Sequence, residues 1–330
     1  MTRIWHPIHK ALAGVFVAAL CAFSQSTISA RPGTINYVEG HASIDGQPID
    51  QGQIGHLNLD ANQTIRTDQN SKAEILLTPG VFLRLGSDAE LQMIAPSLTN
   101  TKVEILRGEA LVAVAQLYKD NNLEVMNNGA STQILKKGIY SFNADPPQVS
   151  VYDGKAAVVD GDRHVDVKKG RRVTFTSGKL KAEKFDRKQH DDLYAWSNLR
   201  SRYAAEASYA TARNIVVNNY AGWGYNAGWF WNPWYSSWAF LPGAGYFSGP
   251  FGWSFYSPAA VYYEPRYFIR PGYSYPVNRS FGRVPPGVHQ IIRGPQSTPV
   301  RPAPSIQAPR PAPRVAVPRA PMMRSPGVGR

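Results

Sequence analysis

The chain has 330 residues, with 36 lysines and arginines against 23 aspartates and glutamates, a formal net charge of +13, and one cysteine, Cys21. A single cysteine excludes an internal disulfide and any site built from several thiolates. The chain must therefore hold itself together by burying apolar surface, and about 300 residues suffice for one sizeable core with appendages.

The first element is an apolar run of thirteen residues, 11–23, preceded by Arg3 and Lys10 and followed by small residues up to Ala30. A helix that spans a bilayer needs about 20 apolar residues. A basic start, a short apolar run and a small-residue exit are typical of a secretory signal peptide. The sequence predicts a signal peptide over 1–30 and an exported protein, periplasmic or extracellular and associated with the cell envelope.

Two alternatives concern the same segment. Cys21 would be lipidated in a lipoprotein, although the bulky Leu20 before it makes a poor lipidation signal. The apolar run would otherwise stay uncleaved as an anchor. If the signal is removed, Cys21 leaves with it, which excludes cysteine nucleophiles from the mature chain.

Short runs of β-branched and apolar residues recur every eight to twelve residues over 31–184, separated by turn pairs. The pairs begin at Asp45, Pro79, Asp153 and Asp160, each followed by glycine, and favour tight turns between antiparallel strands. Alternation within 73–77, 81–85 and 164–168 lets one side chain in two face a core and its neighbours face water. The pattern predicts an all-β domain, either a β-sandwich or a stacked β-solenoid.

A helical period follows over 185–215. The proposed apolar stripe recurs at three- and four-residue steps and consists of Leu193, Trp196, Leu199, Tyr203, Ala207 and Ala210. This spacing predicts one long amphipathic helix. Asp186 and Gln189 have the spacing of a capping box at its start. The stripe either docks on the β domain or binds a partner.

The segment 216–281 is rich in glycine, proline and aromatic residues, which excludes a long helix or a membrane span. One interpretation is an aromatic layer packed against the body or against itself. The other is an exposed platform for sugar rings, peptides or the envelope surface, because tryptophan offers a large face at low entropic cost. The candidate ligand-binding residues are Trp223, Trp229, Trp231, Trp234, Trp238 and Trp253.

The positive charge is concentrated at the end of the chain. Eleven arginines follow Glu264 without a lysine or an acid; with Arg3 and Lys10 they account for 13 basic residues, which leaves 23 against 23 acids elsewhere. Prolines interleave with them over 282–330, so we expect a disordered polyproline-rich tail that attracts anions. The candidate anion-binding residues are Arg301, Arg310, Arg314, Arg319 and Arg324. The predicted export argues against nucleic acid as the partner.

The β zone resembles the FecR domain, the periplasmic part of ferric-citrate-type signalling regulators. Three stretches carry the resemblance: 64–68 with 72–85, 103–112, and 149–158 with 168–173. The resemblance implies a mainly β fold in the cell envelope and a regulatory role through protein contacts.

The chain also departs from those regulators. Only ten residues precede the apolar run, where the regulators carry a sigma-factor-binding region, so direct sigma-factor control is not expected. Gly138, Ile139 and Phe142 stand where the family often has Gly-Thr-x-Phe.

No signature of a known catalytic site is present in the sequence. The chain lacks His-Glu-x-x-His, Gly-x-Ser-x-Gly and the phosphate-binding glycine loop, and its histidines are scattered. We therefore predict no enzyme activity, no metal and no cofactor. The expected function is an envelope-associated binding or scaffold role through the aromatic region and the basic tail, with envelope polysaccharide, an anionic lipid surface or a periplasmic protein as partner. The alternative is a sensor or accessory factor in transmembrane signalling that acts through the β domain.

Overall fold

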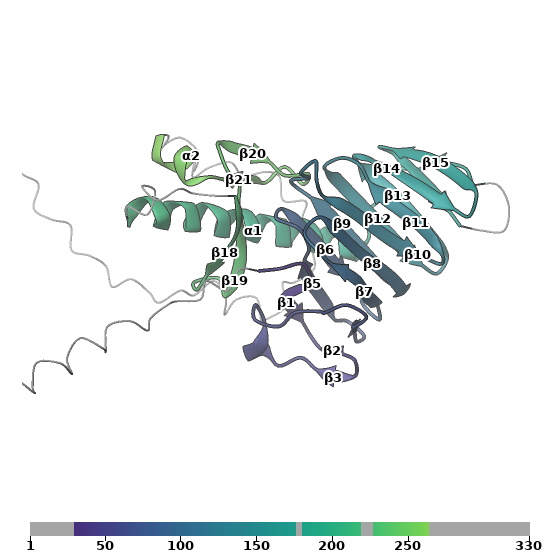
Figure 1. Cartoon of the computed structure of the whole chain (residues 1–330), viewed down its shortest axis with the longest axis horizontal. Helices are drawn as coiled ribbons and strands as arrows, with labels where there is room; N and C mark the ends of the chain where they lie inside the picture. The colour runs from purple at the N-terminus through teal and green to yellow at the C-terminus, as the bar shows by residue number, and fades with distance from the viewer. Residues whose placement is uncertain (1–29, 176–179, 219–226, 264–330) are drawn as a thin grey trace, which may run out of the picture. The chain divides into compact units, whose positions relative to one another are not determined.

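The computed structural model describes residues 30–175, 180–218 and 227–263 (Figure 1). All of these belong to one compact unit, residues 1–278, whereas the second unit, 279–330, lies outside the described residues. The predicted basic tail and all of the predicted signal peptide except Ala30 therefore also lie outside them.

Two sheets form the β domain, which confirms the predicted mainly β fold. Sheet A has eight strands, in the spatial order β1 (Thr34–Glu39), β5 (Lys72–Leu76), β6 (Val81–Leu85), β9 (Glu109–Val114), β12 (Gly138–Ala144), β13 (Pro147–Asp153), β16 (Arg171–Thr174) and β17 (Glu183–Lys184). Sheet B has nine, in the order β15 (Arg163–Lys168), β14 (Lys155–Asp160), β11 (Ala130–Ile134), β10 (Asn122–Asn127), β8 (Asn100–Arg107), β7 (Glu90–Pro96), β4 (Thr64–Thr67), β2 (Ala42–Ile44) and β3 (Gln47–Pro48). A 3-10 helix, Gln51–Gln53, follows β3.

The chain passes repeatedly from one sheet to the other, so consecutive strands are often not neighbours. The turns that begin at Asp45, Pro79 and Asp160 join antiparallel neighbours, as predicted. The turn at Asp153 does not, because β13 lies in sheet A and β14 in sheet B. Gly154 makes that crossing with φ +102°, and a Cβ there would lie 2.1 Å from the Tyr140 hydroxyl, so the position requires glycine.

The main core lies between the two sheets. Alternate residues of sheet A, such as Ile75 and Leu83, face those of sheet B, such as Val103 and Val125, and all four are fully buried. The outward residues of β8, β10 and β11 remain half-buried or exposed. Sheet B therefore shows the expected alternation between core and solvent.

Sheet A does not show this alternation. Every residue of β6 is buried, and Glu74, Phe82 and Arg84, which the sequence pattern placed toward water, are fully or almost fully buried on its outer face. A second cluster covers this face, formed by α1 (Asp192–Val217) and by aromatic residues that follow it in the chain. The expectation of a solvated face was wrong here because these later elements pack on it (Figure 1).

Helix α1 begins and packs differently from the prediction. Its N-cap is Asp191, whose carboxylate accepts a hydrogen bond from the Tyr194 amide at 2.6 Å, not Asp186. Leu193 and Trp196 are buried as expected, but Leu199 is 36% exposed. The buried face consists mainly of small residues, Ser197, Ser201, Ala204, Ala205, Ala207, Ser208, Thr211 and Ala212. Small side chains let the helix pack closely on its neighbours. A search for an apolar stripe misses this face because several of its residues are serine or threonine.

The aromatic segment forms two hairpins and a short helix. The hairpins are β18 (Gly228–Asn232) with β19 (Ser237–Leu241), and β20 (Tyr246–Ser248) with β21 (Ser254–Tyr256); α2 (Pro258–Tyr263) follows. The Phe255 ring stacks on Phe82 of sheet A, and the Phe240 ring contacts Phe255 edge to face. These rings pack against sheet A, as the interpretation of an aromatic layer on the body of the protein predicted. Over the described ranges, no helix has the length and hydropathy needed to cross a bilayer.

Candidate functional site

The covered face of sheet A is built around a buried ion pair. Glu74 of β5 and Arg84 of β6 are direct cross-strand partners, and the Arg84 Nε donates to Glu74 Oε2 at 2.9 Å. Both side chains are completely buried. Taking two charges out of water is costly unless further groups partner them, so the surrounding residues decide whether the pair can exist.

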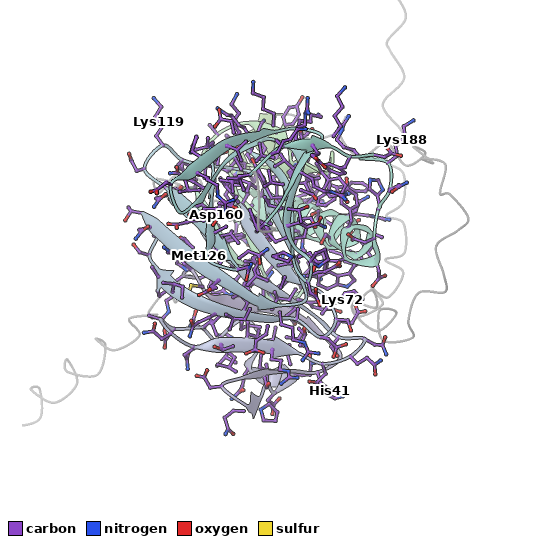
Figure 2. The ribbon with its side chains drawn as sticks, turned by 90° about the vertical axis from the view of Figure 1, so that its right-hand side faces the viewer. His41, Lys72, Lys119, Met126, Asp160 and Lys188 are labelled. Atoms are coloured by element: carbon purple, nitrogen blue, oxygen red, sulfur yellow. The ribbon has the colours of Figure 1, made fainter. Side chains whose placement is uncertain are left out.

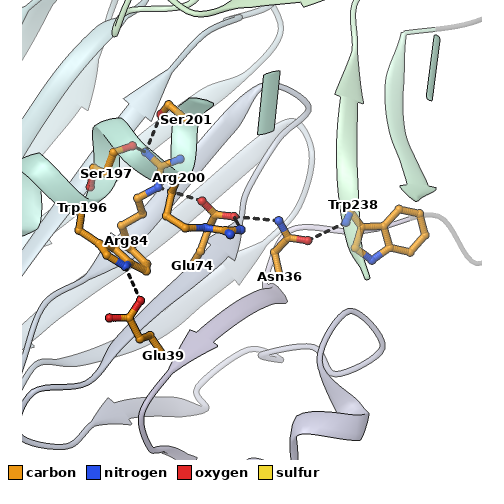
Figure 3. A network of polar contacts seen from close by, with 9 residues as sticks. All are labelled: Asn36, Glu39, Glu74, Arg84, Trp196, Ser197, Arg200, Ser201 and Trp238. Atoms are coloured by element: carbon orange, nitrogen blue, oxygen red, sulfur yellow. Dashed lines mark hydrogen bonds and ion pairs between the residues drawn. The ribbon is translucent and has the colours of Figure 1, made fainter. Parts of the chain in front are cut away.

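Helix α1 supplies those partners (Figure 3). Arg84 Nη1 donates to the Ser197 carbonyl at 2.9 Å and to Ser201 Oγ at 3.0 Å. Arg200 Nη2 donates to Glu74 Oε1 at 2.9 Å, and its guanidinium lies 3.9 Å from the centre of the Tyr37 ring. The ion network therefore joins the helix to sheet A.

Asn36 of β1 extends the same network to the aromatic segment. Its amide nitrogen donates to Glu74 Oε1 at 2.8 Å, while its oxygen accepts from the backbone N–H of Trp238 in β19 at 2.8 Å. The Trp238 indole in turn donates to the Gly55 carbonyl at 2.7 Å. On the helix, the Trp196 indole donates to Glu39 at 2.9 Å. These bonds fix the hairpin and the helix in one arrangement (Figure 3).

The charge state of Glu74 follows from these contacts. Burial raises the pKa of its carboxyl, but the positive charges of Arg200 and Arg84 and the hydrogen bonds from Arg200 and Asn36 outweigh burial and lower the pKa to about 2, below its ordinary 4.5. Glu74 is thus ionised at neutral pH. This network positions α1 and β19.

A groove lies between the second half of α1 and the first aromatic hairpin, β18–β19. Its volume is about 750 Å³. The helix and its C-cap contribute Tyr209, Ala210, Thr211, Arg213, Asn214, Ile215, Val217 and Asn218, and the hairpin contributes Phe230, Trp231, Asn232, Pro233, Trp234 and Tyr235. The wall thus combines aromatic faces with amide and guanidinium groups.

Asn232 determines how the hairpin stands in this groove. Its side-chain nitrogen donates to Thr211 Oγ1 of α1 at 2.8 Å. Its side-chain oxygen accepts from the backbone N–H groups of Trp234 and Tyr235, at 3.0 and 3.3 Å. A buried asparagine therefore holds the turn that carries Trp234, whose residue surface is 65% exposed.

The predicted tryptophan platform is divided by the fold. Trp229 and Trp238, 6% and 5% exposed, are packed in the interior, so they do not offer a face to a ligand; their rings fill the space between the hairpins and sheet A. Trp253 is half-buried and donates to Asn198 at 2.7 Å. Trp231 and Trp234 line the groove.

Several predicted residues lie outside the described part of the chain: Trp223, Arg301, Arg310, Arg314, Arg319 and Arg324. Glu74, Arg84 and Asn36 were missed from the sequence. The available signal was one charge in each of the otherwise apolar stretches 73–77 and 81–85, which a tight turn joins, because such charges face each other across the pair. In the described ranges, no three or more His, Cys, Asp or Glu side chains gather as metal ligands would.

The fold and its helical cover define a two-sheet β domain with an attached C-terminal layer. Residues 63–157 match the model of the family described as FecR protein, so the chain carries a FecR domain. The match spans β4 to β14 and ends before α1 and the groove. The resemblance inferred from the sequence is thereby confirmed.

Two crystal structures from Parabacteroides distasonis, each described as a "putative anti-sigma factor", are similar to the chain. The 1.65 Å structure is 20% identical over 41% of this chain and 64% of its own, with a TM-score of 0.35. The 2.50 Å structure is 14% identical over 55% of this chain and 99% of its own, also with a TM-score of 0.35. This chain thus matches less than two thirds of the first structure. A comparison with curated proteins finds no match.

Proposed function

We propose that this FecR-domain protein is exported and binds envelope polysaccharide in the groove between α1 and the β18–β19 hairpin. The observation that carries the proposal is the exposed ring of Trp234, held in place by Asn232 beside the amides of Asn214 and Asn218. Exposing a large aromatic ring to water is unfavourable, and the Asn232 hydrogen bonds hold the turn so that the ring stays exposed. A ligand that packs on the ring removes this apolar surface from water.

The chemistry of the groove favours a sugar chain. The apolar C–H face of a pyranose ring packs on an aromatic ring, while its hydroxyl groups need planar donors and acceptors at the edge. Asn214 in the last turn of α1 and Asn218 at its C-cap are exposed. The Asn218 side-chain nitrogen donates to the Asn214 side-chain oxygen, so the Asn214 nitrogen and the Asn218 oxygen supply those groups, and Arg213 adds a cation. No covalent step is proposed, and the protein acts as a binding or scaffold component without enzyme activity.

The test is sedimentation of the full chain with purified cell-wall glycan. Trp234→Ala should lower the bound fraction severalfold, because it removes the stacking face and no core contact. Tyr118→Ala, which removes another exposed aromatic residue far along the chain, is the matched control and should bind as the wild type does. Equal binding by all three proteins would contradict the proposal.

Export and retention are tested separately. Cell fractionation with sequencing of the N-terminus should recover a chain that begins near Arg31. A salt wash should then release protein held by its basic tail, since screening weakens Coulomb attraction. Deletion of residues 265–330 should lower retention in low salt; unchanged retention would remove the tail from the proposal. An intact chain that resists salt would mean that 11–23 is an anchor.

The FecR match favours a second candidate, an accessory role in transmembrane signalling through a protein contact of the β domain. The outward side chains of sheet B offer a polar surface for such a contact. A photo-cross-linker at Gln133, which is exposed on β11, should then trap one specific protein in cells. If only background is recovered, as with the cross-linker at Tyr118, this candidate fails.

A further inference from the structure

The charge of the β domain is unevenly distributed, although the body of the chain is neutral. Residues 31–135 carry 12 acidic and 7 basic residues, whereas residues 136–188 carry 7 acidic and 13 basic ones. The later strands therefore form a positive region that belongs to the folded domain and is separate from the arginines after Glu264.

Much of this charge gathers where three connections of the later strands meet. The backbone N–H of Leu135, in the β11–β12 connection, donates to the Lys155 carbonyl at 2.9 Å. Lys155 begins β14 and is the cross-strand partner of Lys168, the last residue of β15. Gly170, in the next turn, donates to the Val151 carbonyl at 2.8 Å.

Residues 185–188 adjoin the same connections. Arg187 Nη1 donates to the Tyr152 carbonyl at 3.5 Å, and a Cβ built on Gly170 would lie 3.5 Å from the Arg187 side chain. Figure 2 shows Lys188 at the edge of the folded ribbon. We name this region the basic end; its cations are Lys136, Lys137, Lys155, Lys168, Lys169, Arg187 and Lys188.

Acidic neighbours neutralise only part of the basic end. Lys155 pairs with Asp166, and Lys169 pairs with Asp153, each at 2.7 Å. Lys136, Lys137 and Lys168 are exposed and form no ion pair with any described residue, although the charge of Lys168 also acts on Asp166. Three solvated lysines therefore remain available to an external anion.

One apolar side chain accompanies these lysines. Leu135 directly precedes Lys136 and is 37% exposed in the same connection. We propose that the basic end docks on an anionic lipid surface, with the lysines at the head groups and Leu135 in the interfacial layer. Each lysine near an anionic leaflet raises the affinity for it about fivefold, and a neighbouring apolar side chain adds burial at the boundary.

The arrangement fits an extended surface better than a small anion. The cations lie on separate connections and have flexible side chains. None of them is buried in a pocket that would surround a single phosphate. A planar array of head groups engages all of them at once. This docking uses neither the groove nor the arginine tail, so it stands or falls independently of polysaccharide binding.

The test is co-sedimentation of the full chain with vesicles of phosphatidylglycerol and phosphatidylcholine at one fixed ionic strength. The variant Lys136→Gln/Lys137→Gln/Lys168→Gln should bind about a hundredfold more weakly, because each of the three lysines is expected to contribute about fivefold. The matched control removes the same charge from exposed positions elsewhere, Arg66→Gln/Arg107→Gln/Lys119→Gln, and should stay within about twofold of wild type. Circular dichroism confirms that both variants fold.

Two further measurements separate the alternatives. Leu135→Ser should weaken vesicle binding, while Leu98→Ser, at another exposed leucine, should not. Equal losses for the two triple variants would mean that overall charge decides, and would overturn the proposal. If the basic-end variant loses binding to a soluble acidic polysaccharide as strongly as to vesicles, and Leu135→Ser changes nothing, the surface binds polyanions in general and the lipid assignment is wrong. Trp234→Ala should leave vesicle binding unchanged whatever becomes of the groove.

Discussion

The outer faces of the two sheets have opposite environments, although their inner faces share one core. On sheet B the outward residues of β8, β10 and β11 stay half-buried or exposed. On sheet A the outward residues of β5, β6 and β9 lie under α1 and the aromatic hairpins, and include the Glu74 and Arg84 ion pair. A strand's own pattern therefore predicts one of its faces, while elements that follow much later decide the other.

The largest expected loss of stability comes from removing one buried charge between sheet A and α1. Glu74→Gln leaves Arg84 and Arg200 without their buried counter-charge and should lower the free energy of unfolding by about 4 kcal/mol. Urea denaturation measures it. Glu104→Gln, on the open face of sheet B, is the control and should change stability by less than about 0.5 kcal/mol. Similar losses for both variants would mean that the two faces do not differ as the structure shows.

The two faces of the covering helix give the next contrast. Leu193→Ala removes a buried side chain against sheet A and should cost about 3 kcal/mol, because it leaves a cavity. Leu199→Ala, at the exposed position of the same helix, should cost less than about 1 kcal/mol. Thermal unfolding of both variants provides the comparison. A larger effect at Leu199 would restore the helix stripe predicted from the sequence.

Acid should lower the stability of the packing of α1 on sheet A, because Glu74 becomes protonated. The folded-state pKa of about 2 lies below the ordinary 4.5, so the unfolded chain binds the proton more readily. The contribution of Glu74 is therefore fully present above about pH 4.5 and is lost as pH falls through about 2, a loss of about 3 kcal/mol. Urea midpoints measured down this range should converge for wild type and Glu74→Gln. A constant difference between them would contradict the assignment.

The smallest predicted change in stability concerns the residue that caps the start of α1. Asp191→Ala removes the side chain that caps α1 and should cost about 1 kcal/mol. Asp186→Ala removes only a turn contact to the Lys188 N–H and should cost less than about 0.5 kcal/mol. Chemical denaturation of the pair decides between the observed cap and the one predicted from spacing.

The sequence by itself determined the elements whose signals are local. The turn residues at 45–46, 79–80 and 160–161, the alternation of β15 and the presence of one long helix were all predictable, because turns and periodicity depend on neighbouring residues. The FecR resemblance was also visible from short motifs in order.

Only the tertiary structure decided which faces are buried and which aromatic rings remain available. Glu74 lies under α1 because Arg200, 126 residues further along, reaches its carboxylate. Trp229 and Trp234, five positions apart, lie in the interior and on the surface, since Asn232 turns the hairpin on Thr211 of the helix. Burial depends on contacts between distant segments, and composition alone carries no record of which segments meet.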